Sequence, residues 1–79
     1  MWGGGSVTDA GERAVVIALC MELRNRRQAR RLTQQQVARA VGTSQARISR
    51  IERGGEIPRL DLLCRLCASL GLQIRLDAS

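Results

Sequence analysis

Two short amphipathic segments joined by a brief turn constrain the fold of this chain most strongly. Thr33 precedes the first segment, residues 34–41, which carries its apolar residues on one side and stops at Gly42. Ser44 precedes the second, residues 45–53, which stops at a pair of glycines. Thr and Ser side chains cap helix N-termini, and glycine accepts the left-handed backbone conformation that ends many helices. The sequence therefore predicts two short helices that meet at a tight turn.

A longer helix is predicted before this pair, and another after it. Thr8 or Asp9 is predicted to cap the longer one, which ends near residues 29–31. Its apolar side chains recur with the 3.6-residue helical period at Val16, Leu19, Cys20 and Leu23. The last helix covers residues 60–70, and its predicted inward positions are Leu60, Leu63, Cys67 and Leu70.

The end of the chain, residues 72–77, alternates apolar and polar residues, which is typical of a short strand. Its apolar positions are Leu72, Ile74 and Leu76. Every other segment is predicted as helix, so this strand would pair with its copy in a second chain across a two-fold axis. A frayed tail is the alternative. Residues 1–8 are predicted to be a flexible tail, which leaves 9–71 as the single domain.

Positive charge is concentrated in the middle of the chain. All 13 basic residues are arginines, and ten of them lie within residues 23–59. Glu52 and Glu56 are the only acids in that stretch. Such a concentration attracts a polyanion, and nucleic acid is the foremost candidate. A basic surface that is merely solvated is the alternative.

The residue types that are missing or too few exclude several functions. The chain has no His and no Lys, so acid–base catalysis by histidine and covalent catalysis by lysine are ruled out. Trp2 is the only aromatic residue, so nucleic-acid bases have almost no ring on which to stack. The longest apolar run, residues 14–21, is too short to span a membrane. We predict a cytoplasmic binding module that is neither an enzyme nor dependent on a cofactor.

Three cysteines raise the question of a metal site. Cys64 and Cys67 form a C-x-x-C pair, and Cys20 lies far before them. A structural zinc site takes four Cys or His ligands, and this chain offers three. The pair also lies inside an apolar helical pattern rather than at a turn. We therefore predict no metal, and three free thiols packed in the core of a protein from a reducing compartment.

The second short helix is predicted to present a face that reads DNA. Ile48 and Ile51 point inward and hold it in place, whereas its outward residues are Gln45, Ala46, Arg47, Ser49, Arg50 and Arg53. In a major groove Gln pairs with adenine, Arg pairs with guanine, and Ala contacts the thymine methyl group. Gln34 opens the first short helix, where its side chain and backbone N–H suit a phosphate. The pair therefore has the layout of a helix-turn-helix.

Many spaced residues agree with one known pattern at once: Leu32-Thr33-Gln34, Val37-Ala38, Val41-Gly42, Ser44-Gln45, residues 48–54, Pro58, Leu63 and Leu70-Gly71. At these positions, within residues 23–72, the chain resembles the Xre/Cro-like helix-turn-helix family of phage repressors and bacterial regulators. The resemblance implies an all-α, phage-repressor-like bundle of four to five helices. A short C-terminal β-strand, paired across a dimer, would complete that fold.

The functional positions of this family fall on particular residues of the chain. The resemblance places base reading on Gln45, Ala46, Ser49 and Arg50. It places contacts near the DNA backbone or groove edge on Gln34, Thr43, Ser44 and Arg47. A structural Arg–Glu ion pair of the family falls on Arg27 and Glu52. Two positions depart from the pattern, because Arg31 stands where Gly commonly ends the first long helix and Arg59 replaces a Ser cap.

The Leu70-Gly71-Leu72 ending and the strand after it are similar to those of HipB-like and HigA-like antitoxins of toxin–antitoxin operons. This similarity implies a homodimer that binds an inverted-repeat operator, represses its own operon and binds a toxin protein. Two alternatives stay open. One is a stand-alone regulator of the same family without a toxin, and the other is a protein-interaction module whose helix-turn-helix no longer reads DNA.

Overall fold

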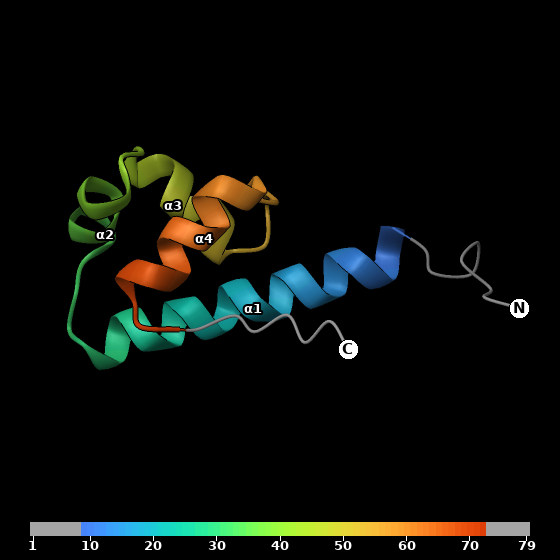
Figure 1. Cartoon of the computed structure of the whole chain (residues 1–79), viewed down its shortest axis with the longest axis horizontal. Coiled ribbons are helices and arrows are strands. Elements are labelled where there is room, and N and C mark those ends of the chain that lie inside the picture. Colours follow the sequence, from blue (N-terminus) through green and yellow to red (C-terminus); the bar gives the residue numbers. More distant parts are fainter. Residues whose placement is uncertain (1–8, 73–79) are drawn as a thin grey trace, which may run out of the picture.

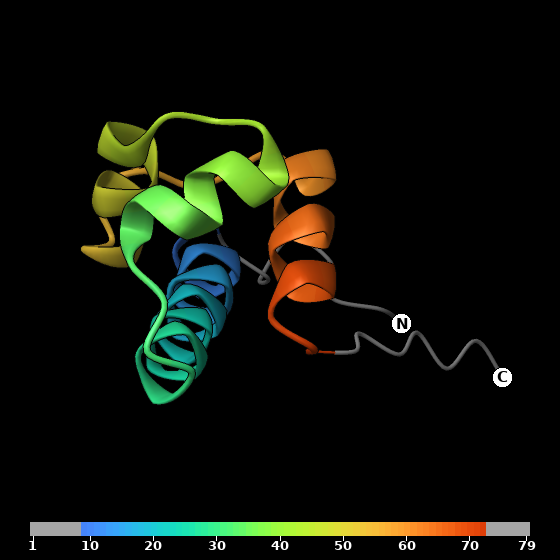
Figure 2. The ribbon, with the colours of Figure 1, turned by 90° about the vertical axis from the view of Figure 1, so that its left-hand side faces the viewer.

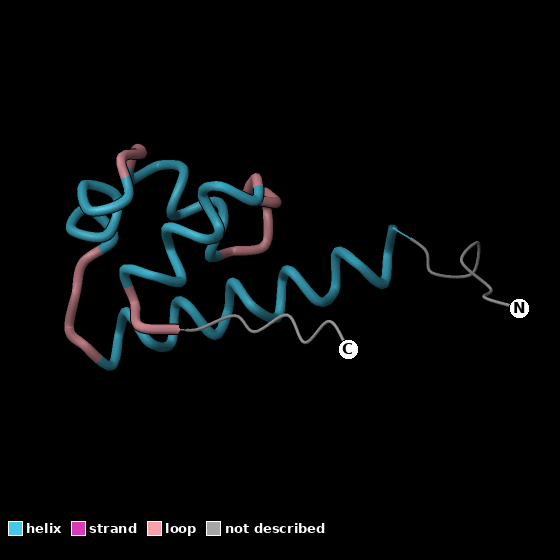
Figure 3. Tube along the Cα trace, viewed as in Figure 1, coloured by secondary structure: helices cyan, strands magenta, loops and turns pink. Residues whose placement is uncertain are grey.

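The computed structural model describes residues 9–72, and this part of the chain contains helices and loops but no strand (Figure 3). The helices are α1 (Asp9–Ala29), α2 (Gln34–Val41), α3 (Gln45–Glu52) and α4 (Leu60–Ser69). The all-helical prediction is confirmed for these residues. None of these helices is long and apolar enough to cross a membrane.

The helices form a small bundle in which α1 runs beneath the other three, and its first turns extend beyond them (Figure 1). The view along α1 shows α3 and α4 on either side, with α2 between them (Figure 2). Helix α2 packs against α3 and α4, and α1 packs against α3. The core between them consists of Cys20, Leu23, Val37, Ala38, Val41, Ile48, Ile51, Leu62, Leu63, Leu66, Cys67 and Leu70.

The start of α2 and the start of α3 are fixed by their predicted caps. The Thr33 hydroxyl accepts a hydrogen bond from the Gln36 backbone N–H at 3.0 Å, and the Gln36 side chain accepts one from the Thr33 N–H at 2.8 Å. The Ser44 hydroxyl accepts the Arg47 backbone N–H at 3.2 Å. Gly42 lies between the two helices at φ 78°, where a Cβ would be strained. Local sequence therefore determines the turn that sets α3 against α2.

The end of α1 uses the same left-handed conformation without a glycine. Arg31 has φ 57°, its N–H donates to the carbonyl of Gln28 at 2.9 Å, and the Leu32 N–H donates to the carbonyl of Arg27 at 3.1 Å. This pair of bonds is a Schellman motif, in which the left-handed position is usually glycine. A left-handed conformation costs a non-glycine residue about 1–2 kcal/mol. Arg31 therefore stores strain at the end of α1.

Replacing Arg31 by Gly is expected to raise the free energy of unfolding by about 1 kcal/mol. The relief of strain is about 1–2 kcal/mol, and the greater flexibility of the unfolded chain takes back about 0.4–1 kcal/mol. The Arg31 side chain is exposed, so little packing is lost. Thermal unfolding followed by circular dichroism should show a rise of several degrees, about 4–8 °C per kcal/mol in a domain of this size. An unchanged or lower midpoint would show that the turn is not strained.

Two predictions for α4 are wrong. Leu60 was expected to point inward, but its side chain is 73% exposed because it is the first residue of the helix and lies beyond the core. Leu62 and Leu66, which were not predicted, are buried instead. Cys64 was expected in the core and is exposed. Helix α4 carries apolar residues on several sides, so the helical period alone does not determine which side faces the core.

Leu72, which was predicted to begin a strand, completes the end of α4 instead. Its N–H donates to the carbonyl of Cys67 at 2.8 Å, and its side chain packs against the core. The remainder of the predicted strand, with Ile74 and Leu76, lies outside the described residues. So do the Thr8 cap and the predicted tail at residues 1–8. The paired strand therefore stays a prediction.

Candidate nucleic-acid interface

Helix α3 is held by three buried side chains and presents a polar outer face. Ile48 and Ile51 are buried in the core, and Glu52 is 9% exposed. The remaining side chains of α3, which are exposed or half-buried, are Gln45, Ala46, Arg47, Ser49 and Arg50. Because the inward residues are fixed, the outward face is presented as one rigid surface.

A bidentate ion pair joins α1 to α3. The Arg27 Nε lies 2.6 Å from Glu52 Oε2, and its Nη2 lies 2.9 Å from Oε1. The Arg27 Nη1 also donates to the carbonyl of Leu32 at 2.7 Å, which ties the pair to the loop before α2. Both side chains are about nine-tenths buried. The structure therefore brings these two residues together as a fixed part of the bundle.

Gln34 connects this ion pair to the exposed start of α3. Its Nε2 donates to Glu52 Oε1 at 2.9 Å, and its Oε1 accepts from Gln45 Nε2 at 2.7 Å. Because a carboxylate only accepts hydrogen bonds, Gln34 must turn its NH₂ group inward and its oxygen toward Gln45. We call this series of contacts, from Arg27 through Glu52 and Gln34 to Gln45, the Arg27–Gln45 relay. It fixes which way the amide of Gln45 is turned.

Glu56, in the loop between α3 and α4, binds two arginines of α3. Its Oε2 accepts from Arg47 Nε at 2.6 Å, and its Oε1 accepts from Arg50 Nε at 3.0 Å. These hydrogen bonds, from Arg47 first and then Arg50, lower the pKa of Glu56 below its ordinary value. The sequence places Glu56 in the basic stretch without assigning it a partner, and the structure pairs it with both arginines. No sequence pattern marks the contact, because it depends on where the loop returns.

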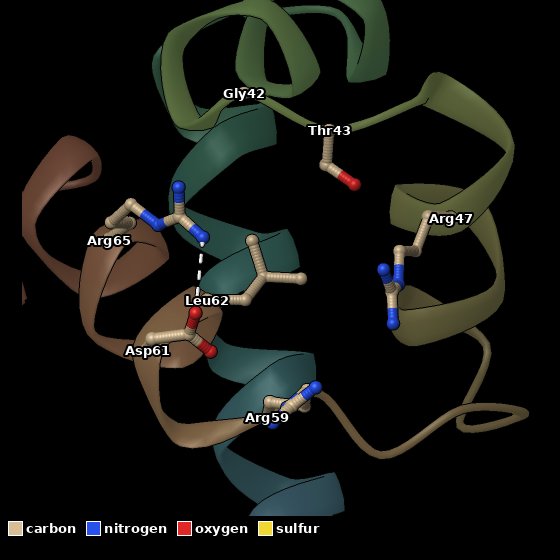
Figure 4. Close-up of a pocket in the computed structure, with 7 residues that line it drawn as sticks. All are labelled: Gly42, Thr43, Arg47, Arg59, Asp61, Leu62 and Arg65. Atoms are coloured by element: carbon tan, nitrogen blue, oxygen red, sulfur yellow. Dashed lines mark ion pairs between the residues drawn. The ribbon is translucent and has the colours of Figure 1, made fainter.

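A cleft with a volume of about 200 Å³ lies between the turn before α3 and the start of α4. Figure 4 shows its lining residues: Gly42, Thr43, Arg47, Arg59, Asp61, Leu62 and Arg65. Arg65 pairs with Asp61 at 3.5 Å. Arg59, which replaces the Ser cap of the family, stands at the N-cap of α4 and makes no side-chain cap bond. Arg47 is paired with Glu56 and Arg65 with Asp61, so Arg59 leaves the cleft with a net positive charge, which suits an anion.

The arginines near the end of α1 have a different setting. The Arg26 Nη1 lies 3.4 Å from the carbonyl oxygen of Gly71, and Arg26 also pairs with Glu22 at 3.5 Å. A Cβ built on Gly71 would lie 2.6 Å from the Arg30 guanidinium, so this side chain covers the same glycine. Positive charge at the C-terminus of a helix is stabilising. Arg26 and Arg30 therefore place positive charge at the C-terminus of α4 and stabilise it.

The described part of the chain holds no group of three or more side chains placed to bind a metal. Its three cysteines are free, with Cys20 and Cys67 buried and Cys64 exposed. Burial raises the pKa of the Cys20 thiol, and Cys67 raises it further. Burial likewise raises the pKa of Cys67. Both buried thiols are thereby kept in the neutral form that suits the core.

A family model described as a helix-turn-helix domain matches residues 18–77, which is most of the chain. The match includes α2, the turn, α3, α4 and the greater part of α1. No curated protein and no solved structure gives a significant match. The two capped short helices, their glycine turn and the buried packing of α3 agree with the family match. This chain therefore belongs to the helix-turn-helix domain family.

Proposed function

We propose that this protein is a sequence-specific DNA-binding transcriptional repressor. The observation that carries the proposal is the Arg27–Gln45 relay, which runs from a buried ion pair to an exposed amide at the start of α3. A fixed amide on the surface adds little to the stability of the fold. It is, however, the arrangement that hydrogen bonding to a base edge requires.

Base reading would rest on the outer face of α3. Gln45 gives one amide hydrogen to Gln34, so a second N–H and the oxygen are left for a ligand. These match the N7 acceptor and the N6 donor that adenine presents in the major groove. Arg50 would pair with guanine, Ala46 would contact a thymine methyl group, and Ser49 would donate to or accept from a base edge.

Phosphate contacts would surround that face. Thr43, Ser44 and Arg47 stand at the turn and in the first turn of α3, beside the groove edge. The cleft between this turn and α4, with Arg59 and Arg65, would take a backbone phosphate. Such contacts fix the position of the protein on the duplex and make its affinity depend on salt.

Arg50→Ala is expected to weaken binding to the preferred sequence by about 1–3 kcal/mol and to relax the preference at one base pair. The preferred sequence comes first from selection by the full chain among random duplexes, and affinities follow by fluorescence anisotropy at fixed salt. Arg13→Ala, which removes the same charge from an exposed position on α1, is the matched control. Failure of the wild type to enrich any sequence would overturn the proposed function. An equal loss on all sequences would reduce Arg50 to a phosphate contact.

We further propose a homodimer that binds an inverted repeat, as the family resemblance implies. Two copies of α3 should read half-sites about 10 base pairs apart, one helical turn. The full repeat should then bind at least about 100-fold more tightly than an isolated half-site, because the second contact becomes intramolecular. Sedimentation of the free protein and titration of both duplexes test this. A monomer with equal affinity for the two duplexes would contradict the dimer.

The antitoxin role is the most specific form of the proposal and rests on the similarity to HipB-like and HigA-like proteins. Under it the protein would repress its own operon and bind a toxin encoded beside it. Co-purification of the full chain with the product of the neighbouring open reading frame tests this form. A regulator that binds its own promoter without such a partner would be the stand-alone alternative. A protein that binds a partner and no duplex would be an interaction module.

A further inference from the structure

The contact between Glu56 and α3 extends the proposed function to a residue outside the helix-turn-helix. Each carboxylate oxygen of Glu56 accepts the Nε of one arginine, Arg47 at 2.6 Å and Arg50 at 3.0 Å. The Glu56 side chain is 22% exposed, whereas those of Arg47 and Arg50 are 40% and 50% exposed. One largely covered carboxylate therefore holds two open guanidinium groups side by side.

The ends of the two guanidinium groups are left for a ligand. Arg47 and Arg50 use their Nε atoms on Glu56, and within residues 9–72 their Nη groups have no hydrogen-bond partner. The guanidinium group is planar, so fixing Nε also restricts the plane in which the Nη groups lie. Pairing with guanine O6 and N7 needs such a defined plane. Contact with a phosphate needs it less, because phosphate offers oxygens in several directions.

The same carboxylate reduces the charge that the DNA backbone meets. The two arginines and Glu56 together carry one net positive charge, not two. Attraction to phosphates is independent of sequence and supplies most of the non-specific affinity. Cancelling part of it lowers binding to every sequence, whereas the Nη groups stay available to bases.

We propose that Glu56 is a positioning residue that raises sequence specificity, by orienting Arg50 toward a base edge and Arg47 toward the groove edge, and by cancelling part of their attraction to phosphates. The inference rests on the proposed DNA-binding function. The contact itself contributes little to the fold, because ion pairs between half-exposed arginines and a carboxylate are weak. Variants at Glu56 should therefore fold normally and differ in how they bind DNA.

The test uses the full chain and three variants. Glu56→Gln removes the charge and keeps the shape, and Glu56→Asp keeps the charge on a side chain too short to hold both arginines. Glu22→Gln is the matched control, since it removes one carboxylate paired with an arginine on α1. Circular dichroism verifies folding. Binding is measured on a random-sequence duplex and on the sequence that the wild type selects, over a range of salt concentrations.

Glu56→Gln should bind the random duplex more tightly, with a salt slope steeper by about 0.9 for each phosphate newly contacted. Its ratio of specific to random affinity should fall by about tenfold, the discrimination of one good base contact. Glu56→Asp should keep the wild-type slope and lose part of the ratio. A Glu56→Gln ratio equal to that of Glu22→Gln, or above it, would overturn the inference and leave the proposed function standing. A wild type that selects no sequence would overturn the proposed function itself.

Discussion

Replacing Arg27 by methionine is expected to lower the free energy of unfolding by about 3–5 kcal/mol, because Glu52 would stay buried without its cation. The pair is nine-tenths covered, and both carboxylate oxygens bind the guanidinium group. Within the described part of the chain, the amide of Gln34 would be the only partner left to the carboxylate. Small domains are stable by about 5–15 kcal/mol in total, so a large share of the stability would be lost. Urea unfolding followed by circular dichroism measures the change.

A double variant separates the cost of an unpaired charge from the value of the pair. Arg27→Met combined with Glu52→Leu removes both charges together, and most of the lost stability should return. Arg13→Met is the control on the same helix, with an expected change within about 0.5 kcal/mol because the position is exposed. A double variant as unstable as the sum of the two single variants would show that the residues act independently.

The double variant also tests the relay. Without Glu52 the amide of Gln34 loses its acceptor, and nothing then determines which way it turns toward Gln45. We expect a folded protein that still binds duplex DNA but prefers its selected sequence less strongly. Retention of full specificity would mean that the relay does not orient Gln45. The Arg27–Gln45 relay would then no longer support the proposed function.

Helix boundaries could be predicted because short-range interactions determine them. The hydroxyl of Thr33 caps α2 through a bond to the backbone N–H three residues later, and Gly42 allows the left-handed turn whatever lies around it. The cap and the glycine turn depend on neighbours within five residues, so the local sequence contains the needed information. Arg31 was identified through the family resemblance instead, as a non-glycine residue at a position where glycine is common.

The contacts made by the site could be predicted only where a known pattern supplied them. The pairing of Arg27 with Glu52 followed from the family resemblance, since 25 residues separate the two. Glu56 was visible as one of two acids in a basic stretch. Its two arginine partners depend on the path of the loop after α3, which charge and periodicity do not specify. The prediction that Leu60 points inward was wrong for a related reason. Where the core ends depends on how the helices pack, which the sequence pattern of one helix does not specify.

The second large effect is expected at Ile48, the most deeply buried residue of α3. Its side chain is 1% exposed and lies in the core shared by the helices. Replacement by alanine should lower the free energy of unfolding by about 2–5 kcal/mol, through lost burial and the cavity left behind. Replacement by valine, which removes one methylene group, should cost about 0.5–1.5 kcal/mol. Urea unfolding gives both values.

Leu60 provides the control for this series, because it is a large apolar residue that is 73% exposed. Leu60→Ala should change the free energy of unfolding by no more than about 0.5 kcal/mol. If it costs as much as Ile48→Ala, then Leu60 is covered in solution and the placement of the start of α4 is wrong. Ile48→Val should also retain sequence preference at temperatures where it is folded, since Gln45 and Arg50 keep their partners. A loss of preference in that folded variant would show that the packing beneath α3, and not only its hydrogen bonds, positions the reading face.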